Sequence, residues 1–203
     1  MIPIALFHSV LGVRPGVIDA ADRLRAAGHE VTVIDQYDGR VFDDYGQASE
    51  FAESIGYGAL MQRAVVGVVH LPDGFIAAGF SNGGGMAEHV AMQRAVAGVV
   101  MLSGVLPLDM LGARGWPLGV PAQIHCTVGD PFRRQGSIDS LGAAIRVAGA
   151  PLELFDYPGD GHLFTDASLP EEYDPDSTRV LWERVLAFCD KPGRTHESGV
   201  GGQ

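Results

Sequence analysis

The chain has 203 residues and a mass of 21.5 kDa; 46% of its residues are hydrophobic and 19% are charged. These values are typical of one globular domain and exclude a disordered or fibrous chain. With 14 basic and 25 acidic side chains the net charge is −11, which disfavours nucleic acid and anionic membrane surfaces as partners.

Apolar runs and amphipathic stretches then alternate along the chain. In chain order, the pattern predicts a strand over 2–7, a helix over 17–27, a strand over 30–35, helices over 47–55 and 59–69, a strand over 74–79, a helix over 82–94, strands over 96–102 and 121–128, a helix over 137–148, a strand over 152–157 and a helix over 177–189. The valine cluster at 65–69 resembles a strand but is assigned to the helix over 59–69.

Three of the later strands are continuous apolar runs, which are typical of parallel strands covered by helices on both faces. We therefore predict an α/β fold, a three-layer sandwich with a mostly parallel central sheet. One domain is expected over residues 1–190, followed by a disordered, glycine-rich tail over 191–203.

The location of the protein is inferred from the targeting, membrane and disulfide patterns that the sequence lacks. The apolar stretch at 2–7 has no basic segment before it and is too short for a secretory signal, and no run approaches the roughly 18 apolar residues of a membrane span. Cys126 and Cys189 show neither metal-ligand spacing nor a disulfide pattern, which favours a reducing compartment. We expect a cytoplasmic protein without a metal site.

One segment has the G-x-S-x-G pattern of a nucleophile turn, and it is centred on Ser81. An apolar strand precedes it and a helix-forming stretch follows. Such a turn holds the serine in a strained conformation and exposes its hydroxyl at the carboxyl edge of the sheet. We interpret Ser81 as a nucleophile, with a glycine-rich loop for packing or anion binding as the alternative.

A serine hydroxyl needs a base and an acid that orients the base, and in this architecture they follow in the order serine, acid, histidine. His162 is the downstream histidine in a loop directly after a strand, at the edge where Ser81 is expected. Asp130, at the end of the fifth strand, is the preferred acid. Asp160 lies too near His162 in sequence, and Asp109 lies in a remote connection.

Two backbone amides are expected to form an oxyanion hole. Asn82 follows the nucleophile, and Val10 lies in the loop after the first strand. The glycines at 12–16 lack dinucleotide spacing and the chain has no Walker-type motif, so no cofactor is expected.

Taken together, these motifs resemble those of the dienelactone hydrolase family of the α/β-hydrolase superfamily. The similar segments lie between residues 2 and 189, at 7–12, 35–37, 79–84, 129–130 and 161–164. The short length, and a histidine followed by Leu163 and Phe164, point to this family more narrowly than the serine turn does. The resemblance implies an α/β-hydrolase fold without a lid domain.

The chain departs from the family pattern at three positions. Founding members carry a cysteine nucleophile and a glutamate just after the first strand, where this chain has Ser81 and Ser9. These two changes agree, because a serine needs no partner for a resting thiolate. Family enzymes hold the substrate carboxylate with arginines, one of them near the catalytic histidine. Asp166 stands there in this chain, and we expect it to repel a carboxylated lactone.

The sequence therefore predicts a cofactor-independent serine hydrolase that cleaves a small carboxylic ester or lactone through an acyl-enzyme, as a monomer or homodimer. A thioesterase or acyltransferase and a non-catalytic binding protein are the alternatives. The residues predicted to line the substrate pocket are His8, Ser9, Tyr37, Trp116 and Phe132.

Overall fold

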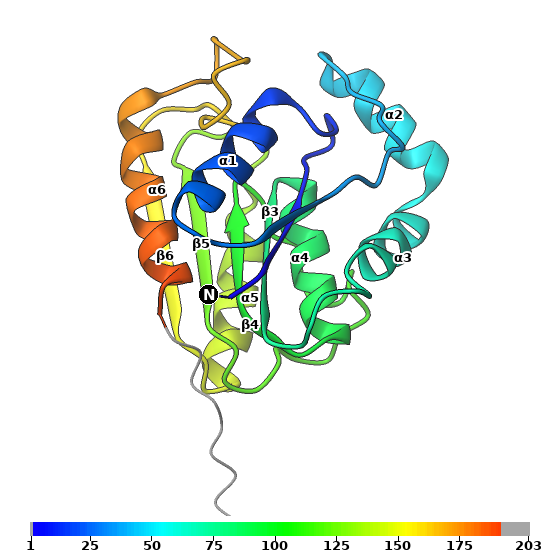
Figure 1. Ribbon diagram of the computed structural model, residues 1–203, viewed down its shortest axis with the longest axis vertical. Helices are drawn as coiled ribbons and strands as arrows, with labels where there is room; N and C mark the ends of the chain where they lie inside the picture. Colours follow the sequence, from blue (N-terminus) through cyan, green and yellow to red (C-terminus); the bar gives the residue numbers. More distant parts are fainter. Residues whose placement is uncertain (1, 192–203) are drawn as a thin grey trace, which may run out of the picture.

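The computed structural model describes residues 2–191, which form a six-stranded sheet and six helices (Figure 1). The elements are, in chain order, β1 (Ile4–Phe7), α1 (Pro15–Ala26), β2 (Val31–Ile34), α2 (Tyr45–Ile55), α3 (Tyr57–Gly67), β3 (Phe75–Phe80), α4 (Asn82–Gln93), β4 (Val96–Leu102), β5 (Ala122–Thr127), α5 (Gln135–Val147), β6 (Leu152–Tyr157) and α6 (Pro175–Cys189). Apart from its first residue, the predicted tail lies outside the described residues.

The sheet has the order β2-β1-β3-β4-β5-β6, and every pairing among these strands is parallel. The prediction of a mostly parallel sheet is confirmed. Because β1 lies between β2 and β3, the direction in which strands are added reverses between β1 and β3. In open parallel sheets, the loops after two such strands diverge and leave room for a site at the carboxyl edge.

Helices cover both faces of the sheet (Figure 1). One face is packed by α1 and α6, through side chains such as Leu24 and Trp182. The other face is packed by α3, α4 and α5, through side chains such as Leu60, Val90 and Leu141. None of the helices in the described part of the chain is long and apolar enough to cross a membrane.

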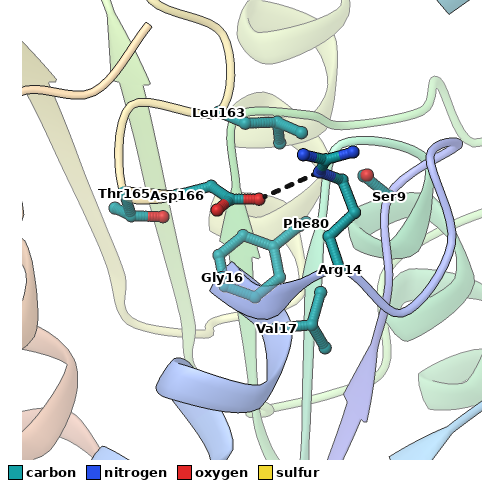
Figure 2. A pocket seen from close by; sticks show the side chains of 8 residues that line it. All are labelled: Ser9, Arg14, Gly16, Val17, Phe80, Leu163, Thr165 and Asp166. Atoms are coloured by element: carbon teal, nitrogen blue, oxygen red, sulfur yellow. Dashed lines mark hydrogen bonds and ion pairs between the residues drawn. The ribbon is translucent and has the colours of Figure 1, made fainter. Parts of the chain in front are cut away.

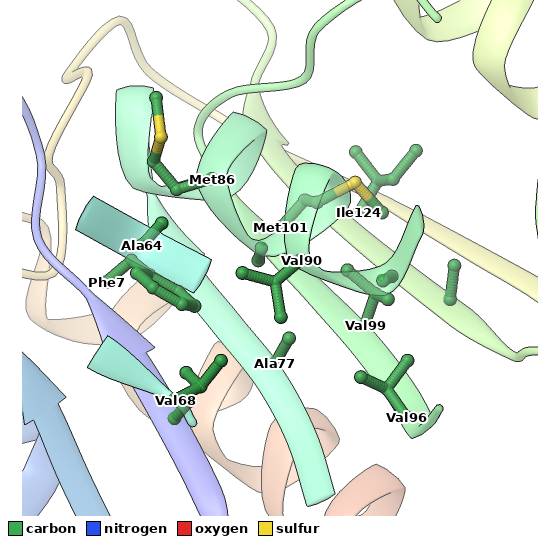
Figure 3. Packing of buried hydrophobic residues seen from close by; sticks show 14 of the residues in the cluster. Phe7, Ala64, Val68, Ala77, Met86, Val90, Val96, Val99, Met101 and Ile124 are labelled. Carbon is green, nitrogen blue, oxygen red and sulfur yellow. The ribbon is translucent and has the colours of Figure 1, made fainter. Parts of the chain in front are cut away.

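Side chains of β3 and β4 alternate between the two faces. Ala77 and Val99 pack with Val90 of α4 in one apolar cluster, which Figure 3 shows from close by. Ile76 and Val100 belong to the cluster on the opposite face. Each of these strands is a continuous apolar run because both of its faces are buried.

Several helices begin about one half-turn earlier than the hydrophobic periodicity predicts, because capping residues extend them. Helix α1 begins at Pro15, a residue favoured in the first turn because its missing N–H is not needed there. The Asp44 carboxylate accepts the Gln47 amide (2.8 Å) and caps α2. Asp174 caps α6 in the same way, directly before Pro175.

Candidate active site

Ser81 occupies the tight turn that joins β3 to α4. Its φ of 52° and ψ of −116° lie in a region that residues with a side chain rarely adopt. The Ser81 amide donates to the Leu102 carbonyl (2.7 Å), and the Ser81 carbonyl accepts from the Gly84 amide (2.9 Å). Hydrogen bonds to both β4 and α4 therefore hold the strained turn in place.

Glycines on either side of Ser81 allow the backbones to approach one another. A Cβ added to Gly79 would meet the Gly83 carbonyl, and one added to Gly83 would meet the carbonyls of Phe7 and His8. The flanking glycines of the motif are thus required by close packing of β1, β3 and α4.

Gly83→Ala is expected to destabilise the protein, because the new methyl group would force the end of β1 away from α4. We expect the free energy of unfolding to fall by about 3 kcal/mol, which is the upper end of the range typical of overpacked core substitutions. Gly58→Ala is the matched control, since its methyl group would meet open space in α3 and alanine favours the helix. Urea denaturation measures both variants, and a Gly83→Ala variant as stable as the parent would contradict the argument.

Three side chains from separate strand ends meet beside the turn. The Ser81 hydroxyl lies 2.6 Å from His162 Nε2, and His162 Nδ1 lies 2.7 Å from Asp130 Oδ2. Because a carboxylate oxygen can only accept, Nδ1 carries the proton and Nε2 accepts from the serine. The structure thus brings the three predicted residues into the relay that a nucleophile, a base and an orienting acid require.

Both oxygens of Asp130 have hydrogen-bond partners. Oδ2 accepts from His162, and Oδ1 accepts from the Phe132 amide at 2.7 Å. The side chain is buried, so these bonds determine how the carboxylate faces the imidazole. The alternative acid, Asp160, is exposed and has no hydrogen bond to His162 among the described residues.

The amides proposed for the oxyanion hole lie in neighbouring segments. Val10 follows β1 and Asn82 opens α4, and Gly83 packs against the carbonyls of Phe7 and His8 between them. Within residues 2–191, neither the Val10 nor the Asn82 amide donates a hydrogen bond. The first turn of α4 also supplies the positive end of a helix dipole at this point.

Phe132 adjoins the relay, as the sequence predicts for a lining residue. Its half-exposed ring lies 4.7 Å, centroid to centroid, from the His162 ring. Tyr45 of α2, which sequence reasoning missed, lies 5.2 Å from Phe132 and 6.0 Å from His162. The Asp44 cap could have predicted from the sequence that Tyr45 lies in the first turn of a helix. Nothing in the neighbouring sequence predicts its contact with His162.

His8 and Tyr37 lie in the core, which corrects their prediction as pocket-lining residues. The His8 Nδ1 donates to the Ser9 carbonyl (2.6 Å), and its Nε2 accepts from the Gln36 amide (3.0 Å), so the ring links the ends of β1 and β2. Burial lowers the pKa of His8. Tyr37 is buried against His8 and Phe51, and burial, with Tyr57 nearby, raises its pKa to about 12.

Trp116 does not lie at the site, a second correction. Its buried indole donates to the Val120 carbonyl (2.7 Å) and lines a groove with Met92 and Gln93, at the far end of α4. At 1.5 Å per residue, that end is about 16 Å from the turn that carries the serine. The long connection between β4 and β5 carries Trp116 toward the opposite edge of the sheet.

Ser9 and Asp166 line a small cavity next to the first turn of α1 (Figure 2). The Ser9 hydroxyl accepts the Leu11 amide (3.2 Å). The cavity has a volume of about 10 Å³, close to the lower limit for one water molecule. Ser9 is thus buried beside a space too small for a substrate, with its hydroxyl bonded to the backbone.

Asp166 is buried and paired with Arg14, which should weaken the expected repulsion of a substrate carboxylate. Its carboxylate lies 3.4 Å from Arg14 Nε, also buried, and accepts the Ser168 hydroxyl (2.6 Å). Arg14, which the sequence analysis did not single out, also donates to Asp43 (2.6 Å). Asp166 and Asp43 thus share the Arg14 guanidinium.

A fully buried carboxyl group lies within α4, behind the serine turn. Glu88 Oε1 accepts the Leu106 amide at 2.8 Å, in the connection whose Gly104 packs directly on the Ser81 backbone. Burial, which outweighs the hydrogen bond from Leu106, raises the pKa of Glu88 well above its usual range. The folded protein therefore favours the neutral acid.

This shift predicts how stability depends on pH. Between the unfolded and folded pKa values of Glu88, the native state holds one more proton, so stability falls as pH rises, by at most about 1.4 kcal/mol per unit. Glu88→Gln should remove this loss and be more stable than the parent at pH 8. The exposed Glu53→Gln in α2 is the control. Parallel stability curves for Glu88→Gln and the parent, from urea titrations between pH 5 and 8, would refute the assignment.

A fully parallel sheet covered on both faces, with a strained serine in the turn after β3, defines an α/β hydrolase. Within this class, the chain belongs to the dienelactone hydrolase family, whose family model matches residues 3–191. The resemblance predicted from the sequence is confirmed. Membership of this family supports the assignment of the protein as a hydrolase.

Solved structures of low identity share the fold. A dienelactone hydrolase-like promiscuous phosphotriesterase from metagenomic libraries is 19% identical, with a TM-score of 0.79 over 93% of this chain and 85% of that chain. A dienelactone hydrolase from Anabaena variabilis ATCC 29413 is 20% identical, with a TM-score of 0.63 over 92% and 84%. A metagenome-derived lipolytic enzyme is 16% identical, with a TM-score of 0.65 over 94% of each chain. No curated protein matches the chain.

Proposed function

We propose that the protein is a serine hydrolase that cleaves a carboxylic ester or lactone through an acyl-enzyme, without a cofactor. The observation that carries the proposal is the continuous relay from Ser81 through His162 to Asp130, with bonds of 2.6 and 2.7 Å. A serine with its hydroxyl bonded to an imidazole, itself oriented by a carboxylate, is an activated nucleophile.

In the first half of the reaction, Ser81 Oγ attacks the carbonyl carbon while its proton passes to His162 Nε2. The carbonyl oxygen becomes an oxyanion facing the Asn82 and Val10 amides, which are free to donate to it. The bond to the alcohol then breaks, and the leaving oxygen takes the proton from His162. Asp130 stabilises the imidazolium that exists between these two transfers.

In the second half, a water molecule gives a proton to His162 Nε2 and attacks the acyl carbon. The second tetrahedral intermediate collapses, the bond to Ser81 Oγ breaks, and His162 returns the proton to the serine. The products are a carboxylic acid and an alcohol, and the protein is regenerated. Each proton is thus carried by the nitrogen that faces Ser81 in the resting structure.

The surroundings of the relay favour a substrate with an apolar group. The rings of Tyr45 and Phe132 lie 6.0 and 4.7 Å from the His162 ring and 5.2 Å from each other, so the three rings form one aromatic cluster. Aromatic surfaces of this kind stabilise apolar or aryl groups by contact area. Small aryl and alkyl esters are therefore the first substrates to test.

A fluorophosphonate probe tests the proposal, because it reacts only with an activated hydroxyl. We expect intact-mass analysis to show one added probe, and peptide sequencing to place it on Ser81. Ser103→Ala is a suitable control, since Ser103 also has a positive φ, of 61°, but is buried and follows β4. Absence of labelling, or a probe on another residue, would refute the proposal.

A further inference from the structure

A second carboxylate makes contact with the segment that carries His162. Glu172 Oε2 accepts the Leu163 amide at 2.6 Å, and Glu172 Oε1 accepts the Tyr45 hydroxyl at 2.9 Å. Glu172 thus joins the residue after the histidine to α2, which lies 127 positions away in sequence. Hydrogen bonds to a charged acceptor are stronger than those between neutral groups. A carboxylate at this position can therefore restrain the loop that carries His162.

The backbone of this segment is also confined. A Cβ added to Gly161 would meet the Glu172 carbonyl, so the two backbones lie against each other. On the other side, the Thr127 hydroxyl of β5 donates to the Gly161 carbonyl at 2.9 Å. His162 therefore lies between one neighbour held by the sheet and another held by Glu172.

Tyr45 connects Glu172 to the His162 ring through a second set of contacts. The hydroxyl of Tyr45 is bonded to Glu172, while its ring packs edge-on toward His162 and tilted on Phe132. Ala48 and Ala52 of α2 are fully buried and Phe51 and Ile55 pack partly buried on the core, all beyond the first turn of the helix, whereas Tyr45 is its first residue. The Tyr45–Glu172 hydrogen bond therefore fixes the start of α2 against the histidine segment.

We propose that Glu172 is a positioning residue that holds His162 at hydrogen-bonding distance from Ser81, through the Leu163 amide and the Tyr45 hydroxyl. The inference rests on the proposed function for its catalytic consequence. The adjacent Glu171 is exposed and has no hydrogen bond among the described residues, so position rather than acidity distinguishes Glu172.

Kinetics of four variants test this role. Glu172→Ala should lower kcat for p-nitrophenyl acetate by about 10- to 100-fold, because a displacement of the His162 imidazole by about 1 Å has that cost. KM should change by less than about threefold. Glu172→Gln should recover most of the activity, since its amide oxygen can still accept from Leu163 and the Tyr45 oxygen can accept from its NH₂. Tyr45→Phe should have an intermediate effect. Glu171→Ala, the control, should match the parent.

Hydrogen exchange supplies a readout that does not require turnover. In Glu172→Ala, the Leu163 amide should exchange at least about tenfold faster than in the parent, because its acceptor is lost. Unchanged exchange, equal kinetic losses in the Glu172→Ala and Glu171→Ala variants, or failure of Glu172→Gln to recover activity would each overturn the proposal. If the parent does not react with a fluorophosphonate, the proposed function fails, whereas the exchange result still decides whether Glu172 restrains the segment.

Discussion

Ser81→Ala is expected to lower kcat for ester hydrolysis by on the order of 10⁶-fold, because no other group can form the acyl-enzyme. Alanine keeps the Cβ of serine, so the turn at φ 52° carries the same strain and the fold should be retained. The residual rate should reflect only the oxyanion amides and substrate binding. Initial rates with p-nitrophenyl acetate, measured at matched protein concentration and verified folding, provide the test.

Ser103→Ala serves as the matched control for this experiment. It removes a hydroxyl from another serine with a positive φ, here a buried one, at the end of β4 rather than β3. We expect it to keep the activity of the parent within about twofold, since the Ser103 hydroxyl is not part of the hydrogen-bonded relay of Ser81, His162 and Asp130. A Ser81→Ala variant that hydrolyses the ester as fast as Ser103→Ala would rule out the proposed nucleophile.

Asp130→Asn is expected to lower kcat by about 10⁴-fold, because the wrong imidazole tautomer would be stabilised. The Phe132 amide is a fixed donor to Oδ1, so the asparagine oxygen should remain there and its NH₂ should face His162. His162 Nδ1 would then have to accept, which leaves the proton on Nε2. The nitrogen that faces Ser81 could no longer remove the serine proton.

Asp160→Asn provides the comparison for that variant. It makes the same change of charge two residues from His162, on an exposed side chain. We expect it to behave like the parent in a steady-state assay. If Asp130→Asn retained more than about a tenth of the parent kcat, orientation by Asp130 could not be part of the mechanism.

The family, the order of the elements and the meeting of three side chains were predictable because each follows from a short-range rule. Apolar runs indicate buried parallel strands, and the ends of parallel strands share one edge of a sheet. Ser81 directly follows β3, and Asp130 and His162 lie in the short loops after β5 and β6, so all three are expected at the same edge of the sheet. Helix starts were displaced where the signal was a cap, as at Asp44, rather than a hydrophobic period.

By itself, the sequence determined the layered fold and the strand ends at which a serine, an acid and a histidine meet. Only the tertiary structure decided that Trp116 lies at the far end of α4, that Asp166 pairs with Arg14, and that Glu172 contacts Tyr45. The reason is that periodicity records burial along one element, whereas these contacts depend on the paths of long connections. The packing of the whole domain determines which side chains meet, and Arg14 and Asp166, like Tyr45 and Glu172, are more than a hundred residues apart in sequence.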